Sequence, residues 1–340
     1  MRASELDYTL PDDLIAQQPA QKRDASRLLV VNRATGTLHS DVYANVANHL
    51  RAGDCLVLNK SKVIRARLHG RKETGGRVEI FLLRELSRGE WECLMRPSAK
   101  IKEGSVIHVS ETVKAVAGTV LSEGKRVVRF DPPDVLAVLE REGEMPLPPY
   151  IRRDSPDPTD LTRYQTIYAE SPGSVAAPTA GLHFTPEVFA ALDTAGIQRT
   201  ELTLHVGYGT FKPIQAEDLR NHTLDGEDYE FSPEAAERLN LTRTRGGRVI
   251  AVGTTATRVL ESQCQNGSFH PGNGTTRLFI YPPYTFQAVD VLQTNFHLPR
   301  SSLLALVCAF AGTELTMEAY RYAVRERFRF YSYGDVMLIL

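Results

Sequence analysis

The stretch RVEIFLLRELSRGEWECLM, residues 77–95, alternates apolar and polar side chains on both sides of a turn at Gly89. A period of two is typical of a β-strand that buries one face. Similar segments lie before and after it at intervals of about ten residues, separated by glycine-containing turns. Six short strands at this spacing predict a small barrel or sandwich. The expected strands are 63–68, 77–83, 91–95, 105–109, 113–121 and 125–130.

The residues on either side of this β region alternate short apolar runs with helix signals. The runs 28–31 and 55–58 are bounded by turn residues, as buried strands are. Further expected strands are 200–206, 248–252 and 278–281, and expected helices are 135–142, 185–196, 253–262, 301–311 and 317–328, with another beginning after Ser232. The sequence therefore predicts an α/β main domain with an inserted small all-β barrel domain. We expect residues 1–60 and 150–340 to form the discontinuous α/β catalytic domain, and 61–149 to form the inserted barrel domain.

Charge is distributed unevenly along the chain. The 340 residues carry 40 Lys and Arg against 41 Asp and Glu, a net charge of −1. Residues 61–130 alone contain 15 Lys and Arg against 8 Asp and Glu, a net charge of +7. Clustered cations neutralise the phosphates of a nucleic acid, so this segment favours an RNA-binding surface. An ordinary solvated barrel surface is the alternative.

Several classes of protein are not favoured. The longest strongly apolar run, 303–311, is far shorter than the roughly 20 residues of a membrane span. Acidic residues near the N-terminus argue against a signal peptide. None of the four cysteines lies in a C-x-x-C pair, so we expect reduced thiols and a cytoplasmic protein. The nine histidines form no metal-binding motif, and no metal is expected.

Five segments place polar and small residues inside otherwise apolar stretches. They are AAPTAGLHFT (176–185), TLHVGYGTF (203–211), GTTATR (253–258), TNFHLPRSS (294–302) and FYSYGD (330–335). The ends of strands in α/β sheets are where ligands bind, and glycine permits close approach of the backbone. The start of the helix at GTTATR suits an anion such as a carboxylate, although simple N-capping is the alternative. A lone histidine in such a segment is more often structural than catalytic.

These segments, in this order, resemble the S-adenosylmethionine:tRNA ribosyltransferase-isomerase family of queuosine biosynthesis. The resemblance extends through RDASRLLVVN (23–32), WECLMRPSAKIKEG (91–104), MPLPPYIRR (145–153) and YRYAVRERFRFYSYGDVMLIL (320–340), and so covers nearly the whole chain. Two residues depart from the family pattern. Lys60 follows Asn59 where the family usually has Asp, and Pro283 replaces a glycine.

The resemblance implies transfer of the ribosyl part of S-adenosylmethionine to 7-aminomethyl-7-deazaguanine at the tRNA wobble position. The ribose is isomerised to an epoxycyclopentane, which gives epoxyqueuosine-tRNA and releases adenine and methionine. No metal or redox cofactor is implied, because S-adenosylmethionine is a co-substrate. Imidazoles suit the proton transfers, so His183 or His205 is the expected base, and the other of the two or His297 assists the departure of adenine.

The resemblance and the residue types together suggest binding residues. For S-adenosylmethionine these are Thr179, Gly181, Phe184, Gly207, Gly209, Thr210, Gly253, Thr254, Thr255, Arg258, Tyr284, Asn295 and Phe296, with Tyr284 or Phe296 facing the sulfonium. For the tRNA backbone they are Arg65, Arg67, Arg96, Lys100, Arg152, Arg153 and Arg163. We expect a monomer that does not bind membranes.

Three alternatives stay open from the sequence. A conventional methyltransferase would use the same co-substrate, but no glycine-rich turn follows the first expected strand. A non-catalytic RNA-binding protein would explain the cationic segment alone. A family member weakened by Lys60 is the third.

Overall fold

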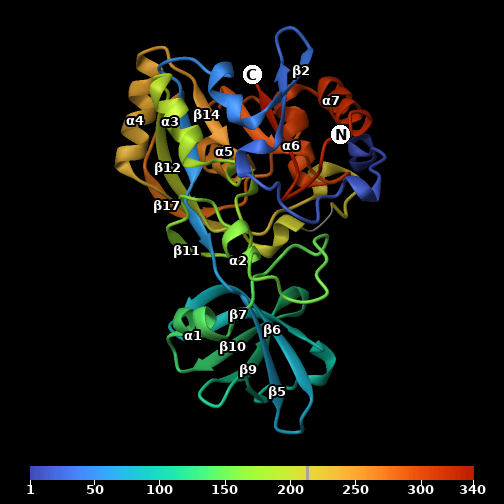
Figure 1. Ribbon diagram of the computed structural model, residues 1–340. Helices are drawn as coiled ribbons and strands as arrows, with labels where there is room; N and C mark the ends of the chain where they lie inside the picture. The colour runs from blue at the N-terminus through green and yellow to red at the C-terminus, as the bar shows by residue number, and fades with distance from the viewer. Residues whose placement is uncertain (212–213) are drawn as a thin grey trace.

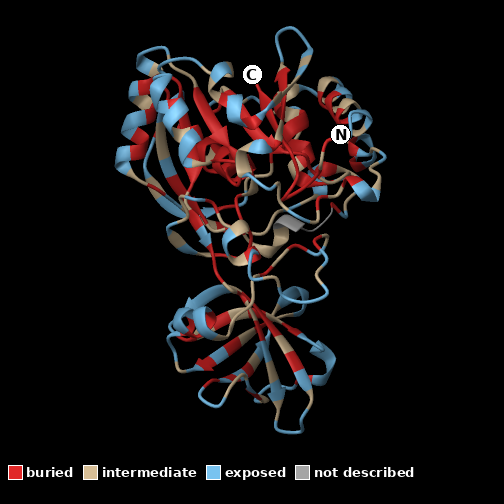
Figure 2. Ribbon diagram, viewed as in Figure 1, coloured by how far each residue is buried: buried red, intermediate tan, exposed pale blue. Residues whose placement is uncertain are grey.

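The computed structural model describes residues 1–211 and 214–340, with only the backbone of Thr210 and Phe211. The chain forms a larger α/β body that holds both termini and a smaller β body built from the middle of the sequence (Figure 1). Each body buries its own apolar residues, which appear as separate red regions in Figure 2. This architecture confirms the predicted fold class, an α/β domain with an inserted β-barrel.

The larger body is built on a nine-stranded mixed sheet with the order β17-β13-β12-β3-β14-β18-β19-β1-β2. Its central strands β12, β3, β14 and β18 are parallel, and β19 runs antiparallel to β18 but parallel to β1. The bounds are β1 Arg27–Asn32, β2 Thr37–Val42, β3 Cys55–Asn59, β12 Gln198–Leu204, β13 Glu227–Phe231, β14 Val249–Val252, β17 Gly272–Thr276, β18 Val291–Asn295 and β19 Val336–Ile339. Because parallel strands end at the same edge, the segments after β12, β14 and β18 are brought together.

Helices cover both faces of this sheet. α3 (Pro186–Thr194) and the 3-10 helix η4 (Tyr43–His49) pack on one face. α4 (Pro233–Thr244), α5 (Gly253–Gln263), α6 (Ser302–Ala311) and α7 (Thr313–Arg325) contribute to the core on the other face. Four of the helix starts predicted from the sequence have side-chain caps. The capping residues Asp134, Thr185, Ser232 and Ser301 each accept a hydrogen bond from the backbone N–H three residues further on.

The smaller body is a closed six-stranded barrel with the order β10-β7-β6-β5-β8-β9. Its strands are β5 Arg67–Lys72, β6 Arg77–Ser87, β7 Glu90–Arg96, β8 Val106–His108, β9 Lys114–Val120 and β10 Lys125–Asp131. The barrel closes because β9 pairs with β10, which removes the exposed edges that an open sheet would have. α1 (Val135–Glu142) adds Val135, Val138 and Leu139 to the barrel core. The division of the whole chain at 60/61 and 149/150 stays a prediction.

Two expected strands are wrong as placed. The segment 63–68 is divided, because β4 (Ser61–Val63) leaves the α/β body paired in parallel with the returning β11 (Ser171–Ser174), and the barrel begins only at Arg67. Residues 278–281 form no strand, since the edge of the sheet is completed by β17 instead, and the carbonyl of Leu278 accepts a hydrogen bond from Arg258. The remaining α-helix and strands are the short elements α2 Asp160–Arg163, β15 Cys264–Gln265 and β16 Ser268–Phe269.

One buried ion pair joins the starts of two central strands. Asp54 is 1% exposed, and its carboxylate accepts hydrogen bonds from the backbone N–H of Arg51 at 2.9 Å and from the guanidinium of Arg248 at 2.6 Å.

Replacing Asp54 by Ala leaves the N–H and the guanidinium without their acceptor. We expect the free energy of unfolding to fall by about 3 kcal/mol, measured by urea denaturation. The matched control is Asp193→Ala, whose partner Arg199 lies at 2.9 Å but whose side chain is 55% exposed. The loss of unfolding free energy in Asp193→Ala should stay below about 1 kcal/mol. Equal losses in the two variants would contradict the assignment.

Candidate active site

A cavity lies where the parallel strands of the sheet end. The 3-10 helix η7 (Thr179–Gly181), the start of α5 and the end of β18 line it. Seven residues predicted from the sequence lie on its wall, namely Thr179, Gly253, Thr254, Thr255, Asn295, Phe296 and His297. Segments more than 100 residues apart in the sequence therefore meet at this place, which we call the strand-end cavity.

Asn295 organises the buried polar side of this cavity. Its Oδ1 accepts a hydrogen bond from the hydroxyl of Thr179 at 2.8 Å. Its Nδ2 lies 3.2 Å from Nε2 of His183 and 3.3 Å from the carbonyl oxygen of Asp335. Nδ1 of His183 lies 2.9 Å from the hydroxyl of Ser26, which itself donates to the carbonyl of Arg23. This network assigns the proton of His183 to Nδ1, so both ring nitrogens have protein partners.

Both histidines of this region are uncharged near neutral pH. Burial, with the positive charge of Arg23, lowers the pKa of His183 to about 3. Burial alone lowers the pKa of His297 to about 3. Nε2 of His297 lies 2.8 Å from the hydroxyl of Thr294. Removing an imidazole from water disfavours its charged form, so neither group is a strong base in this environment.

The start of α5 is the part of the cavity best suited to an anion. Gly253 has a φ of +91°, a backbone conformation that favours glycine. The N-cap residue of α5 is Val252, whose side chain makes no capping hydrogen bond. Thr254 and Thr255 belong to the first turn and are buried, and Nδ2 of Asn59 lies 3.4 Å from the hydroxyl of Thr255. A helix start directs N–H groups and positive potential outward, which favours a carboxylate.

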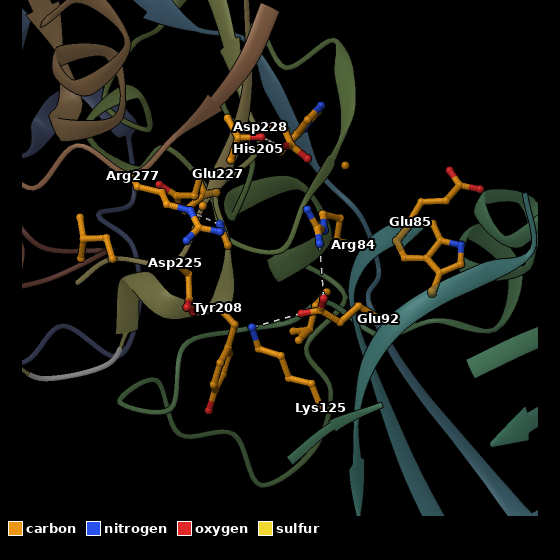
Figure 3. A pocket seen from close by; sticks show the side chains of 18 of the residues that line it. Arg84, Glu85, Glu92, Lys125, His205, Tyr208, Asp225, Glu227, Asp228 and Arg277 are labelled. Carbon is orange, nitrogen blue, oxygen red and sulfur yellow. Dashed lines mark hydrogen bonds and ion pairs between the residues drawn. The ribbon is translucent and has the colours of Figure 1, made fainter. Parts of the chain in front are cut away.

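A second cavity, which we call the interdomain cavity, lies between the barrel and the sheet (Figure 3). His205 and Asp228 line it from the α/β body, and Arg84, Glu92 and Lys125 line it from the barrel. The two barrel cations both pair with Glu92, at 3.5 Å for Arg84 and 3.1 Å for Lys125. Val206 lines both this cavity and the strand-end cavity, so the two adjoin.

His205 differs from the two buried histidines. Its Nδ1 has no hydrogen-bond partner among the described residues. Burial lowers its pKa, but the negative charges of Asp228 and Glu230 act against that shift. Gly173 lies against the ring, because a Cβ there would come within 2.8 Å of Nδ1. His205 therefore lines the interdomain cavity, with its Nδ1 buried against Gly173 and without a partner among the described residues.

Arg258 and the two glycines Gly207 and Gly209 lie together beside a smaller hollow. The guanidinium of Arg258 forms a buried ion pair with Glu227 and donates to the carbonyl of Leu278 at 2.9 Å. Glu227 also accepts a hydrogen bond from the N–H of Gly207 at 2.8 Å. Arg258 therefore positions the segment after β12 through Glu227.

Besides Gly207, Gly209 and Arg258, three more of the predicted binding residues do not line the strand-end cavity. Phe184 is fully buried and stacks on Phe189 with 4.9 Å between ring centroids. Gly181 lies against Tyr168, since a Cβ would come within 2.0 Å of the Tyr168 hydroxyl. Tyr284 is at the other end of α5, where its hydroxyl donates to Glu261 at 3.2 Å. The side chain of Thr210 lies outside the described residues.

The predicted tRNA-contacting residues fall into two groups. Arg96, Lys100 and Arg152 are exposed. In contrast, Arg153 forms two hydrogen bonds with the buried Asp160, at 2.8 and 3.0 Å, and Arg163 donates to backbone carbonyls of residues 20 and 21. Arg65 donates to the carbonyl of Glu140, and Arg67 lies over the ring of Phe81 with its Cζ 5.8 Å from the centroid.

Sequence reasoning did not assign Tyr150 and Ser332 to the site. Both line the strand-end cavity, and their hydroxyls lie 2.7 Å apart. Tyr150 lies in MPLPPYIRR and Ser332 in FYSYGD, so the resembling segments held the signal. Lys60 pairs with Glu170 at 2.7 Å and lines neither of the two cavities. Among the described residues, no group of three or more His, Cys, Asp or Glu is placed to hold a metal ion.

Comparison with known proteins identifies the class of protein that this fold and site define. A family model described as queuosine biosynthesis protein matches residues 3–339. The chain therefore belongs to the queuosine biosynthesis protein family, as the resembling segments predicted.

Individual relatives agree over the full length. The chain is 49% identical to proteins named S-adenosylmethionine:tRNA ribosyltransferase-isomerase from Thermotoga petrophila and Symbiobacterium thermophilum, with all of each chain covered. It is also similar to the crystal structure of S-adenosylmethionine tRNA ribosyltransferase from Thermotoga maritima. That match has a TM-score of 0.57 and 40% identity, and it covers 99% of this chain and 100% of the other.

The lowered pKa of His297 predicts how stability depends on pH. Below the unfolded-state pKa of about 6.5, the unfolded chain binds a proton that the folded chain binds only below about 3. Stability from this group is therefore present above pH 6.5 and is lost as the pH falls. For His297→Asn, we expect the fall in unfolding free energy between pH 6 and pH 5 to be smaller than in the parent by about 1.4 kcal/mol per pH unit. Denaturant titrations at several pH values measure this slope. The exposed His39 provides a control variant, His39→Asn. A slope in His297→Asn equal to that of the parent would contradict the buried neutral state.

Proposed function

We propose that the strand-end cavity binds S-adenosylmethionine and that the adjoining interdomain cavity admits the target base of a tRNA. The chain is an S-adenosylmethionine:tRNA ribosyltransferase-isomerase. It transfers and isomerises the ribosyl group onto 7-aminomethyl-7-deazaguanine, gives epoxyqueuosine-tRNA, and releases adenine and methionine. The single observation that supports the placement of the two substrates is that Val206 lines both cavities.

The strand-end cavity offers complementary groups for the donor substrate. The carboxylate of the methionine part pairs with the positive start of α5 at Gly253, Thr254 and Thr255. Phe296 is fully buried at the cavity wall and excludes water beside the sulfonium. His297, held neutral, donates or accepts a hydrogen bond at the departing adenine without adding charge.

The reaction needs a base as well as binding groups. The sulfonium acidifies the neighbouring C5′–H, and the attacking amine must lose a proton before or as it bonds to carbon. Among the three predicted histidines, His205 is the one that lines the interdomain cavity, so it is the base we propose. His183, whose nitrogens are both hydrogen-bonded, positions Asn295 instead.

The tRNA must present a single base to the interdomain cavity. An anticodon-loop nucleotide is single-stranded and can be turned outward at low cost. We propose that the exposed cations Arg96, Lys100 and Arg152 contact its backbone and that the enzyme acts as a monomer in the cytoplasm. The four cysteines are unpaired. Among the described residues, no single helix is long and apolar enough to cross a bilayer.

Replacing His205 tests the assignment of the base. For His205→Gln we expect adenine release with the substrate tRNA to fall by about 100-fold, with little change in the KM for S-adenosylmethionine. The products are separated by chromatography, and adenine with methionine, rather than S-adenosylhomocysteine, distinguishes ribosyl transfer from methyl transfer. His39→Gln is the control and should retain the parent rate. A normal rate in His205→Gln would rule out this base.

Replacing both hydroxyls at the start of α5 tests the donor site. We expect Thr254→Val/Thr255→Val to weaken S-adenosylmethionine binding by about 10-fold, because the buried polar wall loses hydrogen-bonding capacity toward the carboxylate. Calorimetric titration without tRNA measures the change. Thr244→Val, on the exposed side of α4, is the matched control. Equal affinities in the two variants would place the carboxylate elsewhere.

A further inference from the structure

One face of the barrel carries a row of cations that neither cavity uses. In the strand register, Arg77 of β6 lies opposite Arg71 of β5, and Arg71 lies opposite His108 of β8. His108 in turn lies opposite Lys114 of β9. Residues directly opposite one another in an antiparallel pair project from the same face of the sheet. Four adjacent strands therefore present basic residues side by side, and all four residues are exposed.

A second row runs beside the first. His69 of β5 lies opposite Glu79 of β6, which lies opposite Arg96 of β7. Because His69 and Arg71 are two residues apart on one strand, the two rows share the outer face of the barrel. We call these residues the β5 face, comprising Arg67, His69, Arg71, Arg77, Arg96, His108 and Lys114. His69, Arg71, Arg77, Arg96 and His108 also line one shallow groove, together with the acidic Glu79.

The arrangement is unfavourable for the barrel by itself. Like charges directly opposite each other on neighbouring strands destabilise a sheet, and Arg71 and Arg77 form such a pair. None of Arg71, Arg77, Arg96 or Lys114 forms an ion pair with a carboxylate in the part of the chain that the structure describes. A row of this kind is expected where an external anion compensates for the repulsion.

Cations elsewhere on the inserted region behave differently. Arg129 pairs with Glu90 at 3.4 Å, and Arg141 of α1 pairs with Glu142 at 3.3 Å. Lys125 and Arg84 share Glu92. The net charge of +7 over residues 61–130 is therefore not spread evenly, and its uncompensated part includes Arg71, Arg77, Arg96 and Lys114 of the β5 face.

The backbone brings these strands unusually close. A Cβ at Gly70, between His69 and Arg71, would come within 2.6 Å of Cγ2 of Ile107 and 2.8 Å of the carbonyl oxygen of His108. Gly70 thus permits β5 and β8 to pair at the groove. The spacing of Arg71 and His108 depends on this contact.

The β5 face leads away from the interdomain cavity. Arg67 begins the outward side chains of β5 and lies over Phe81, and Phe81 contacts Tyr208 of the cavity wall with 5.5 Å between ring centroids. Arg67, His69 and Arg71 then follow on alternate residues, a span of about 13 Å along the strand. A polyanion held at the cavity therefore has this face as its continuation, in which Arg67 and His69 have the acidic partners Glu79 and Glu144 and Arg71 has none among the described residues.

We propose that the β5 face binds the phosphate backbone of the tRNA stem adjoining the anticodon loop. This inference rests on the proposed function, which places an anticodon-loop base in the interdomain cavity. Regularly spaced cations with few apolar anchors suit a uniform polyanion, and backbone contacts of this kind fix register without reading sequence. An acidic protein surface is the competing partner.

The test compares two double variants that remove the same charge. Arg71→Gln/Arg77→Gln removes the opposed pair, and Arg129→Gln/Arg141→Gln removes two cations that have acidic partners. For the first variant we expect tRNA affinity at 0.1 M salt to fall about 10-fold and the log–log salt dependence to lose about one to two units of slope. The control should bind tRNA within about twofold of the parent. Binding is measured with tRNA both with and without the 7-aminomethyl-7-deazaguanine base.

Melting temperature and S-adenosylmethionine binding separate this role from a structural one. Because the variant loses a repulsion, its melting temperature should equal or exceed that of the parent while its tRNA affinity falls. S-adenosylmethionine affinity and the rate at saturating tRNA should not change. The proposal would be overturned by equal tRNA affinity in the parent and the Arg71/Arg77 variant, or by equal losses of tRNA affinity in the two double variants. It would also be overturned if the Arg71/Arg77 variant lost only its binding to polyglutamate, which represents an acidic protein surface. Failure of the parent to release adenine would instead refute the proposed function, whatever the tRNA affinities.

Discussion

The side-chain amide of Asn295 connects segments that lie far apart in the sequence, and the active-site edge depends on it. Asn295 ends β18 and reaches Thr179, His183 and the backbone of Asp335. The carboxylate of Asp335 accepts hydrogen bonds from the N–H groups of Arg27, at 2.9 Å, and Arg329, at 2.8 Å. One buried chain of hydrogen bonds thus fixes the ends of β18, β1 and β19 and the helix η7 relative to one another. A buried amide can do this only when each polar atom has a partner, so the network favours one geometry.

A second set of contacts couples the barrel to the segment that carries His205. The chain leaves the α/β body through β4 and returns through β11, and these strands pair in parallel. Ser174, at the end of β11, accepts a hydrogen bond from Ile64 N through its carbonyl and from Val206 N through its hydroxyl, both at 2.9 Å. Any change in the exit angle of the barrel therefore acts on the residues beside the interdomain cavity. Lys60 lies at the same crossing, where its ion pair with Glu170 ties the two strands together.

The sequence predicted the elements of the fold better than their arrangement. The period-two segments predicted the barrel because a closed barrel buries one face of every strand and solvates the other. The helix caps at Thr185 and Ser232 were readable because capping is local. The sheet order was not predictable from local pattern, since β19 inserts between β18 and β1 through contacts about 300 residues apart. The expected strand at 63–68 was wrong because its first half pairs outside the barrel, a long-range choice that side-chain alternation does not encode.

The candidate site shows the same limit at the level of single residues. His183 and His205 look alike in the sequence, since each follows a leucine near small residues. Their surroundings differ. Both ring nitrogens of His183 have hydrogen-bond partners, Asn295 and Ser26, whereas Nδ1 of His205 has none among the described residues. Burial acts on both pKa values in the same direction, so the carboxylates Asp228 and Glu230 beside His205 make the chemical difference. Those acids lie on β13, which pairs with β12. No local sequence motif predicted this strand. The pKa of His205 therefore depends on the pairing of β12 with β13, because that pairing brings the imidazole and the carboxylates to the same edge of the sheet.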